Sequence, residues 1–138
     1  MYRNMFKITP INDKKMQKKI ADTCGAKFNE DFFAYAMTDA ESGDIMGFSQ
    51  FEIDGEFGYI SALSPKIGYD DFEAMFILGR ATMNFIDTCG AHHCRAAVDA
   101  AEERLIKAIG FKLCDEEYIC DMTGMFDGHC NGHAIELK

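Results

Sequence analysis

The sequence has little proline, no tryptophan and no long apolar run, and each absence limits what the chain can be. Its 138 residues include only two prolines and no repeat or low-complexity tract that would mark a linker or a repeat protein. No apolar run approaches the ~20 residues that span a bilayer, and the N-terminal residues lack the apolar core of a secretory signal. We therefore predict a single domain over residues 1–138 that stays in the cytoplasm and does not enter a membrane.

Basic residues are also scarce. Fourteen Lys and Arg stand against 23 Asp and Glu, which gives a formal net charge of −9. Binding to nucleic acid depends on neutralising phosphates, so this balance predicts no nucleic-acid partner and disfavours an anionic membrane surface. An acidic chain suits a cationic partner such as an amine, although many acidic proteins are acidic only for solubility.

Cysteine and histidine are present, but not in a pattern typical of a metal site. The cysteines are Cys24, Cys89, Cys94, Cys114, Cys120 and Cys130, and without a secretory signal we expect them to be reduced thiols. Residues 92–94 and 129–133 hold histidine beside cysteine, but neither segment has a C-x-x-C pair or a complete set of four ligands. Neighbouring residues on a strand point to opposite faces, so His93 would not activate Cys94. We predict no metal site.

The spacing of apolar residues predicts an α/β domain. Strands are expected at 5–8, 33–38, 45–53, 57–63, 93–98, 111–114 and 118–122. Helices are expected from a cap at Asn12 or Asp13 to Gly25, at 72–88 and after Asp99, and Asp54-Gly55 predicts a tight hairpin turn. The role of residues 124–138 stays open, with a short strand at 134–137 as one option.

Each predicted helix has its own pattern. Met16, Ile20 and Cys24 give the first an apolar stripe opposite several lysines. The helix at 72–88 is apolar almost all round, which predicts cover by the sheet and by a partner, such as the second copy of a homodimer. Asp99, with Glu102 three residues later, is expected to cap the short helix.

Three short motifs stand at matching places in this order of elements. They are Gly43-Asp44-Ile45-Met46-Gly47-Phe48, Ser64-Pro65 and Leu105-Ile106-Lys107-Ala108-Ile109-Gly110-Phe111. With the order of elements over about residues 5–122, they make the chain resemble the GNAT acetyltransferase superfamily. The resemblance implies an α/β fold in which helices flank a mixed, mostly antiparallel sheet.

The resemblance also implies a cofactor, acetyl-CoA, and an amine acceptor on a small molecule or a protein. In the family the pantetheine arm follows the fourth strand, and the pyrophosphate lies on the loop before the long helix, where helix amides attract an anion. Carried over to this chain, the cofactor would contact Ser61, Ala62, Leu63, Ile67, Gly68, Tyr69, Asp70 and Asp71.

This chain departs from the family in the same loop. The family pattern is R/Q-x-x-G-x-G/A, and its two glycine positions, counted from Pro65, fall on Asp71 and Glu73. These residues lack the backbone freedom of glycine and place negative charge where pyrophosphate would lie. They are better explained as acidic residues in the first turn of a helix.

The expected proton donor is missing as well, because the tyrosine that the family often has in the short helix falls on Ile106. Glu52, Tyr59 and Tyr118 remain as candidate catalytic residues that could relay a proton, although strand residues of these types more often serve packing or solubility. The sequence therefore leaves two possible functions. One is transfer of an acyl group from acetyl-CoA to an amine, and the alternative is a catalytically inactive GNAT-fold module for binding or dimerisation.

Overall fold

A computed structural model describes residues 5–126, which form one seven-stranded sheet in the order β1-β2-β3-β4-β5-β7-β6. The strands are β1 (Phe6–Pro10), β2 (Phe33–Asp39), β3 (Ile45–Asp54), β4 (Phe57–Pro65), β5 (His93–Ala96), β6 (Lys112–Cys114) and β7 (Glu117–Asp121). Strands β4 and β5 pair in parallel, and the other neighbours pair antiparallel. The predicted fold class and order of elements are confirmed.

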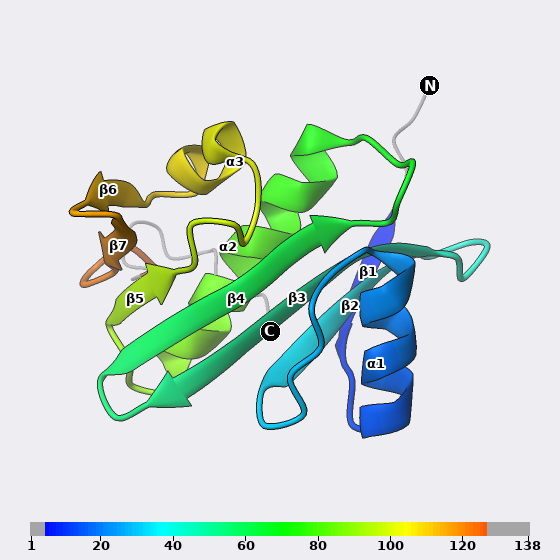
Figure 1. Cartoon of the computed structure of the whole chain (residues 1–138), viewed down its shortest axis with the longest axis horizontal. Coiled ribbons are helices and arrows are strands. Elements are labelled where there is room, and N and C mark those ends of the chain that lie inside the picture. The colour runs from blue at the N-terminus through cyan, green and yellow to red at the C-terminus, as the bar shows by residue number, and fades with distance from the viewer. Residues whose placement is uncertain (1–4, 127–138) are drawn as a thin grey trace.

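Three helices cover the sheet unequally (Figure 1). Helices α2 (Phe72–Thr88) and α3 (Glu103–Ala108) lie on one face, and α1 (Lys14–Thr23) lies on the other. Figure 1 shows α1 over the half of the sheet formed by β1 to β3, so β4, β5 and β7 have no helix in front of them. Three of the hollows described below lie on this uncovered half of the sheet, and one lies on the opposite face beside α2 and α3.

Two clusters of buried side chains hold these layers together. The larger lies between the sheet and helices α2 and α3, and it includes Phe51, Ile60, Leu78 and Ile106. The smaller lies under α1. A fully buried side chain of this size contributes about 1.5–3 kcal/mol, so the larger cluster dominates the stability of the domain.

A β-bulge in β4 changes which side chains face each cluster. Gln50 of β3 pairs with Ala62 and Phe51 pairs with Ile60, so Ser61 is an extra residue between the two pairs. The extra residue shifts the alternation, and Leu63 joins Ile60 in the larger cluster. The strand pattern predicts Phe57, Tyr59, Ser61 and Leu63 on one face, and this is wrong for Leu63 because of the bulge.

Helix α1 begins after Asp13, one of its two predicted caps, and the carboxylate of Asp13 accepts a hydrogen bond from the Lys15 amide at 3.0 Å. The predicted stripe is wrong at Met16, which is 46% exposed, while Gln17 is fully buried. Burial of this amide is possible because its Nε2 donates to Gln50 Oε1 at 3.0 Å and to the Asn29 carbonyl at 3.2 Å.

Two turns also differ from expectation. The hairpin between β3 and β4 turns at Gly55 and Glu56, between the paired residues Asp54 and Phe57, and Gly55 adopts a φ of +63°. Helix α3 begins after Glu102, so Asp99 does not cap it. A turn in which the Ala100 amide donates to the Ala97 carbonyl comes first and delays the helix.

Residues 127–138, including the optional strand at 134–137, lie outside the described residues.

Candidate functional site

Strands β4 and β5 separate at their carboxyl ends. Their parallel pairing runs from Phe57 and His93 to Ile60 and Ala96, where β5 ends, whereas β4 continues to Pro65. Hollows lie on both faces of the sheet beside this separation, and Ser64 and Asp99 line the hollows on both faces. The end of β4 is therefore reached from the α2 side and from the α1 side.

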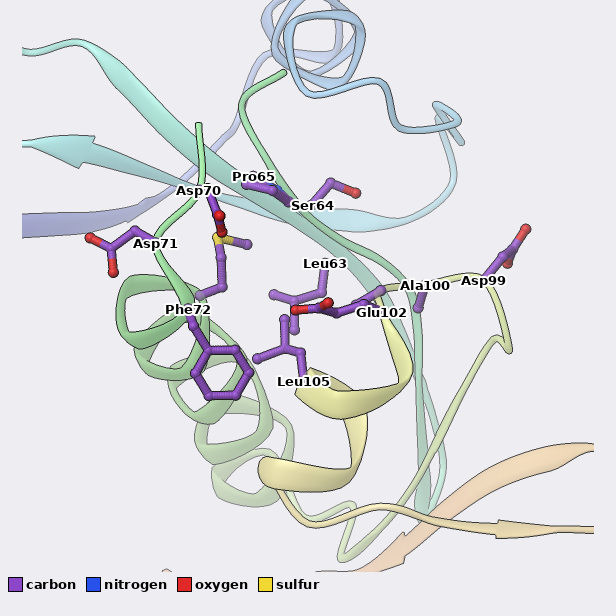
Figure 2. A pocket seen from close by; sticks show the side chains of 12 residues that line it. Leu63, Ser64, Pro65, Asp70, Asp71, Phe72, Asp99, Ala100, Glu102 and Leu105 are labelled. Atoms are coloured by element: carbon purple, nitrogen blue, oxygen red, sulfur yellow. The ribbon is translucent and has the colours of Figure 1, made fainter. Parts of the chain in front are cut away.

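The hollow on the α2 side, which we call the donor-side pocket, has a volume of about 340 Å³. Its apolar walls include Leu63, Phe72 and Leu105 (Figure 2). Four acidic residues also line it, Asp70, Asp71, Asp99 and Glu102, but the carboxylates of Asp71 and Asp99 point away from the space between α2 and α3 (Figure 2). In the described part of the chain no lysine or arginine lines it. Like charges about 4 Å apart repel by about 1 kcal/mol even in water, so this pocket disfavours an anion.

Asp71 uses its carboxylate to complete helix α2. Its Oδ1 accepts a hydrogen bond from the Ala74 amide at 3.0 Å, and its Oδ2 accepts one from the Tyr69 hydroxyl at 3.2 Å. Burial raises the pKa of Tyr69, and the nearby carboxylate raises it further. The positive end of α2, where the resemblance places a pyrophosphate, is thus capped by a side chain of the protein.

The loop before α2 is also bonded within the chain. The Ile67 amide donates to the Thr23 carbonyl at 3.1 Å, and the Tyr69 amide donates to the Lys66 carbonyl at 2.8 Å. Gly68 adopts a φ of +87°, which glycine tolerates. Two amides that a bound anion would use therefore already have acceptors.

The track expected for pantetheine along β4 is closed in the same way. The Leu63 amide donates to the Ala100 carbonyl at 2.8 Å, and the Ala97 amide donates to the Ile60 carbonyl at 3.0 Å. The segment between β5 and α3 therefore lies against the outer edge of β4. Ser61 is engaged too, because its hydroxyl accepts a hydrogen bond from Gln50 Nε2 at 3.0 Å.

On the α1 side, Tyr59 stands where three hollows meet. The largest, about 430 Å³, is lined by Phe28, Phe32, Gln50, Ser61, Ala62 and Asp99, among others. The second, about 290 Å³, is lined by Glu52, Asp54, Phe57, Gly58, Arg95 and Glu117. The third, about 370 Å³, is lined by Ala96, Ala97, Val98, Asp99, Glu116 and Glu117. Tyr59 lines all three hollows and is the one described residue that they share.

Carboxylates surround Tyr59. Partial burial raises its pKa, and the negative charges of Asp99, Glu117 and Glu52 raise it further. Glu52 is the direct partner of Tyr59 across β3 and β4. Two of the residues predicted to move a proton therefore lie together, and the phenol stays protonated at neutral pH.

Tyr118, the third candidate, lies elsewhere. Its side chain is 5% exposed and belongs to the larger cluster, whereas Glu117 before it lines the hollows on the other face. The alternation of β7 separates the two side chains, so Tyr118 does not join Glu52 and Tyr59. Ile106, at the family's tyrosine position, is also buried.

The sequence does not single out Glu117 or Arg95 as site residues. Arg95 Nε lies 3.8 Å from Glu117 Oε2, and its guanidinium lies 4.9 Å from the ring centre of Phe57. The alternation in β7 indicates an exposed face at Glu117, but its place beside Tyr59 depends on the order of the strands. That order is set by the whole fold and not by a local pattern.

The histidines beside Cys94 do not form a metal site with it. His92 Nδ1 lies 2.6 Å from Asp87 Oδ1, and His93 Nε2 lies 3.7 Å from Asp121 Oδ1. Cys94 is buried, and burial raises the pKa of its thiol to about 12. Among residues 5–126 no three side chains of the His, Cys, Asp or Glu type gather as a metal site would require, and residues 129–133 lie outside the described residues.

No helix within residues 5–126 is long and apolar enough to cross a membrane.

Comparison with solved structures identifies the fold. Over 86% of this chain and 96% of the other, it matches Tetrahymena GCN5 with a TM-score of 0.67 at 11% identity. It matches a GNAT family acetyltransferase from Brucella melitensis, solved with acetyl-CoA, over 86% of this chain and 89% of the other, with a TM-score of 0.65 at 11% identity. It matches a GNAT family N-acetyltransferase from Escherichia coli, solved with CoA, over 94% of this chain and 86% of the other, with a TM-score of 0.64 at 13% identity. No protein-family model and no curated protein matches the sequence.

Proposed function

We propose, from the premise that this chain has the fold of the GNAT acetyltransferases, that it works as a binding and dimerisation module rather than as a CoA-dependent enzyme. A fold alone does not determine function, so the proposal depends on the site. The observation that carries it is the closed edge of β4, where the Leu63 amide already donates to the Ala100 carbonyl at 2.8 Å.

The residues of the donor-side pocket do not fit the diphosphate of CoA. A diphosphate at the start of α2 would lie near Asp70, with the Glu102 carboxylate on the opposite wall (Figure 2). The start of a helix favours an anion by about 0.3–1 kcal/mol, and here the Asp71 carboxylate already occupies that position. The guanidinium of Arg104 lies 3.9 Å from the ring centre of Phe72 at the edge of this region and does not line the pocket.

Calorimetric titration with acetyl-CoA and with free CoA tests the proposal. We expect no saturable binding up to millimolar concentration, and the Brucella melitensis acetyltransferase, solved with acetyl-CoA, serves as the positive control. A triple variant, Asp70→Asn, Asp71→Asn and Glu102→Gln, removes three charges while asparagine preserves the helix cap. Micromolar binding to the unmodified chain would overturn the proposal.

Acyl transfer to an amine is the second candidate, and one observation favours it. Ser64 and Asp99 line hollows on both faces of the sheet, so a group on one face lies near an acceptor on the other. In this case the Tyr59 phenol would hold a proton that it can donate, and Glu52 beside it would accept one from a cationic amine. Micromolar cofactor binding followed by loss of activity in Tyr59→Phe and Glu52→Gln would establish it.

A further inference from the structure

The face of the sheet that carries α1 has two unequal halves. Helix α1 covers the half formed by β1 to β3, and β4, β5 and β7 lie uncovered beside it (Figure 1). The uncovered half exposes apolar side chains, with Phe57 45% exposed, Val98 58% and Ile119 39%. A raised helix therefore lies next to a lower, partly apolar surface on the same side of the molecule.

The uncovered half is strongly acidic. Its hollows are lined by five carboxylates, those of Glu52, Asp54, Asp99, Glu116 and Glu117. Only two cationic side chains from the described residues line them, Lys27 and Arg95. Arg95 is already engaged by Glu117 and by the ring of Phe57. The surface thus has an excess of negative charge that complements a cationic partner.

The outer side of α1 has the opposite charge. Gln17, Ile20 and Ala21 face the sheet, so the helical period places Lys15 and Lys19 on the far side, four residues apart. Among residues 5–126, neither of these lysines has a carboxylate within 4 Å, whereas Lys18 lies 3.6 Å from Asp22. The exposed side chain of Met16 adds an apolar contact surface to the same helix.

We infer that the partner of the uncovered half is a second copy of this chain, whose α1 docks on it through Lys15 and Lys19. A twofold axis along the boundary between the two halves places each α1 over the acidic half of the other copy. The same contact is then made twice, which gives a closed dimer. The lysine stems cover Phe57 while their ammonium groups reach the carboxylates. This inference rests on the proposed function as a binding and dimerisation module, and it assigns the surface involved.

The mass of the protein in solution tests whether the dimer exists. Sedimentation equilibrium of the full chain at 100 μM in 50 mM NaCl should give twice the 15.5 kDa of one chain. Because exposed charge pairs are screened by salt, we expect the dissociation constant to rise about tenfold in 500 mM NaCl. A monomer at low salt, or a mass that keeps rising beyond the dimer with concentration, would overturn the inference.

Charge reversal tests which surfaces meet. One variant carries Lys15→Glu and Lys19→Glu, and the other carries Glu52→Lys and Glu117→Lys. Each alone should weaken its own dimer by at least about tenfold, because like charges then face each other in both contacts. Mixed together they should form a one-to-one heterodimer, since both contacts regain opposite charges.

A matched control variant, Glu41→Lys and Asp44→Lys, reverses two charges in the β2–β3 turn and should leave the dimer unchanged. Circular dichroism of each variant shows that it is folded. A dimer that neither pair weakens uses another surface, such as the exposed Ile77 and Phe85 side of α2, and that result would overturn the inference. So would a mixture that stays monomeric. A dimer formed through another surface would overturn the inference and leave the proposed function standing, whereas a monomer would also remove its dimerisation part. The CoA titration is independent of both results.

Discussion

The backbone amide of Leu63 donates to the carbonyl of Ala100 at 2.8 Å, although Ala100 belongs to no strand. This bond joins the turn after β5 to the part of β4 that extends beyond the end of β5. It satisfies a backbone amide at the edge of β4. Together with the bond from the Ala97 amide to the Ile60 carbonyl, it holds the segment after β5 against the edge of β4, between the hollows on the two faces.

Amide hydrogen exchange measures this closure directly. We expect the Leu63 amide to exchange as slowly as amides within the β3–β4 pairing, because exchange requires opening of its bond to Ala100. The measurement is a two-dimensional NMR exchange series in D₂O, with an amide of the exposed β2–β3 turn, such as Ser42, as the fast reference. Fast exchange at Leu63 would mean that the edge of β4 is open to a ligand.

Asp71 should contribute to stability as the cap of α2. Replacing it with alanine removes the acceptor of the Ala74 amide, and loss of such a cap costs about 0.5–2 kcal/mol. Asp70→Ala is the matched control, and we expect a change within about 0.5 kcal/mol because Asp70 accepts no bond from the helix. Urea unfolding of both variants measures the difference. Equal effects would contradict the capping role.

Much of this architecture can be predicted from the sequence because it follows local patterns. Helix α2 spans the predicted residues, 72–88, since its apolar spacing and the acidic cap both mark its start. Glu52 and Tyr59 are candidates from sequence and lie side by side, because a tight hairpin fixes the register of the strands that carry them. Local signals were sufficient for these two features, but not for the start of α3, where Asp99 is the predicted cap and Glu102 precedes the helix instead.

The rest depends on contacts between distant parts of the chain. The bulge at Ser61 is visible only in the register of β3 and β4, and it decides the side on which Leu63 lies. Gln17 is buried because Gln50, on another element, satisfies its amide. Tyr118 and Glu117 separate to opposite faces of β7, and only the strand order shows that Glu117 meets Tyr59. These relationships are properties of the assembled sheet.

Gly58 allows α2 to lie close to the sheet. A Cβ at this position would come within 2.4 Å of Ile86 Cγ2, which is too close for any side chain. We expect Gly58→Ala to destabilise the fold by about 1–3 kcal/mol, as overpacking does in other cores. Adding Ile86→Ala should recover part of the loss, because it removes the clashing methyl group. Denaturant unfolding of the single and double variants measures this coupling, and strictly additive losses would contradict the close contact.

The buried thiols should be unreactive in the folded protein. Burial raises the pKa of Cys24 to about 11 and that of Cys94 to about 12, so few thiolates exist at pH 8. Cys89 and Cys114 are exposed and should react with iodoacetamide first. Peptide mass spectrometry after timed labelling separates these sites. Labelling of Cys94 as fast as Cys89 would contradict the assigned burial.

The buried thiol of Cys94 also makes the stability of the folded protein depend on pH. The unfolded Cys94 thiol loses its proton near its ordinary value of 9.0, but the folded one holds it to about pH 12. The native state therefore binds more protons between these values, and its stability is full below pH 9 and falls as the pH rises toward 12. Urea midpoints between pH 8 and 10.5 should fall less steeply in Cys94→Ala. Equal slopes in the two proteins would contradict this account.

Tyr59 reports the electrostatics of the uncovered half of the sheet. Burial is the main cause of its raised pKa, and the charge of Asp99 contributes more than that of Glu52. We expect its titration, followed by NMR of ¹³C-labelled tyrosine and assigned with Tyr59→Phe, to have a midpoint above the ordinary value of 10.0. Asp99→Asn should lower that midpoint more than Glu52→Gln does.

The Tyr59 midpoint also tests the dimer. In the dimer, the Lys19 ammonium of the second copy would reach these carboxylates, and a neighbouring cation stabilises the phenolate. The midpoint in the monomeric Lys15→Glu, Lys19→Glu variant should therefore be higher than in the dimer. A midpoint that is the same in monomer and dimer would place the second copy away from Tyr59.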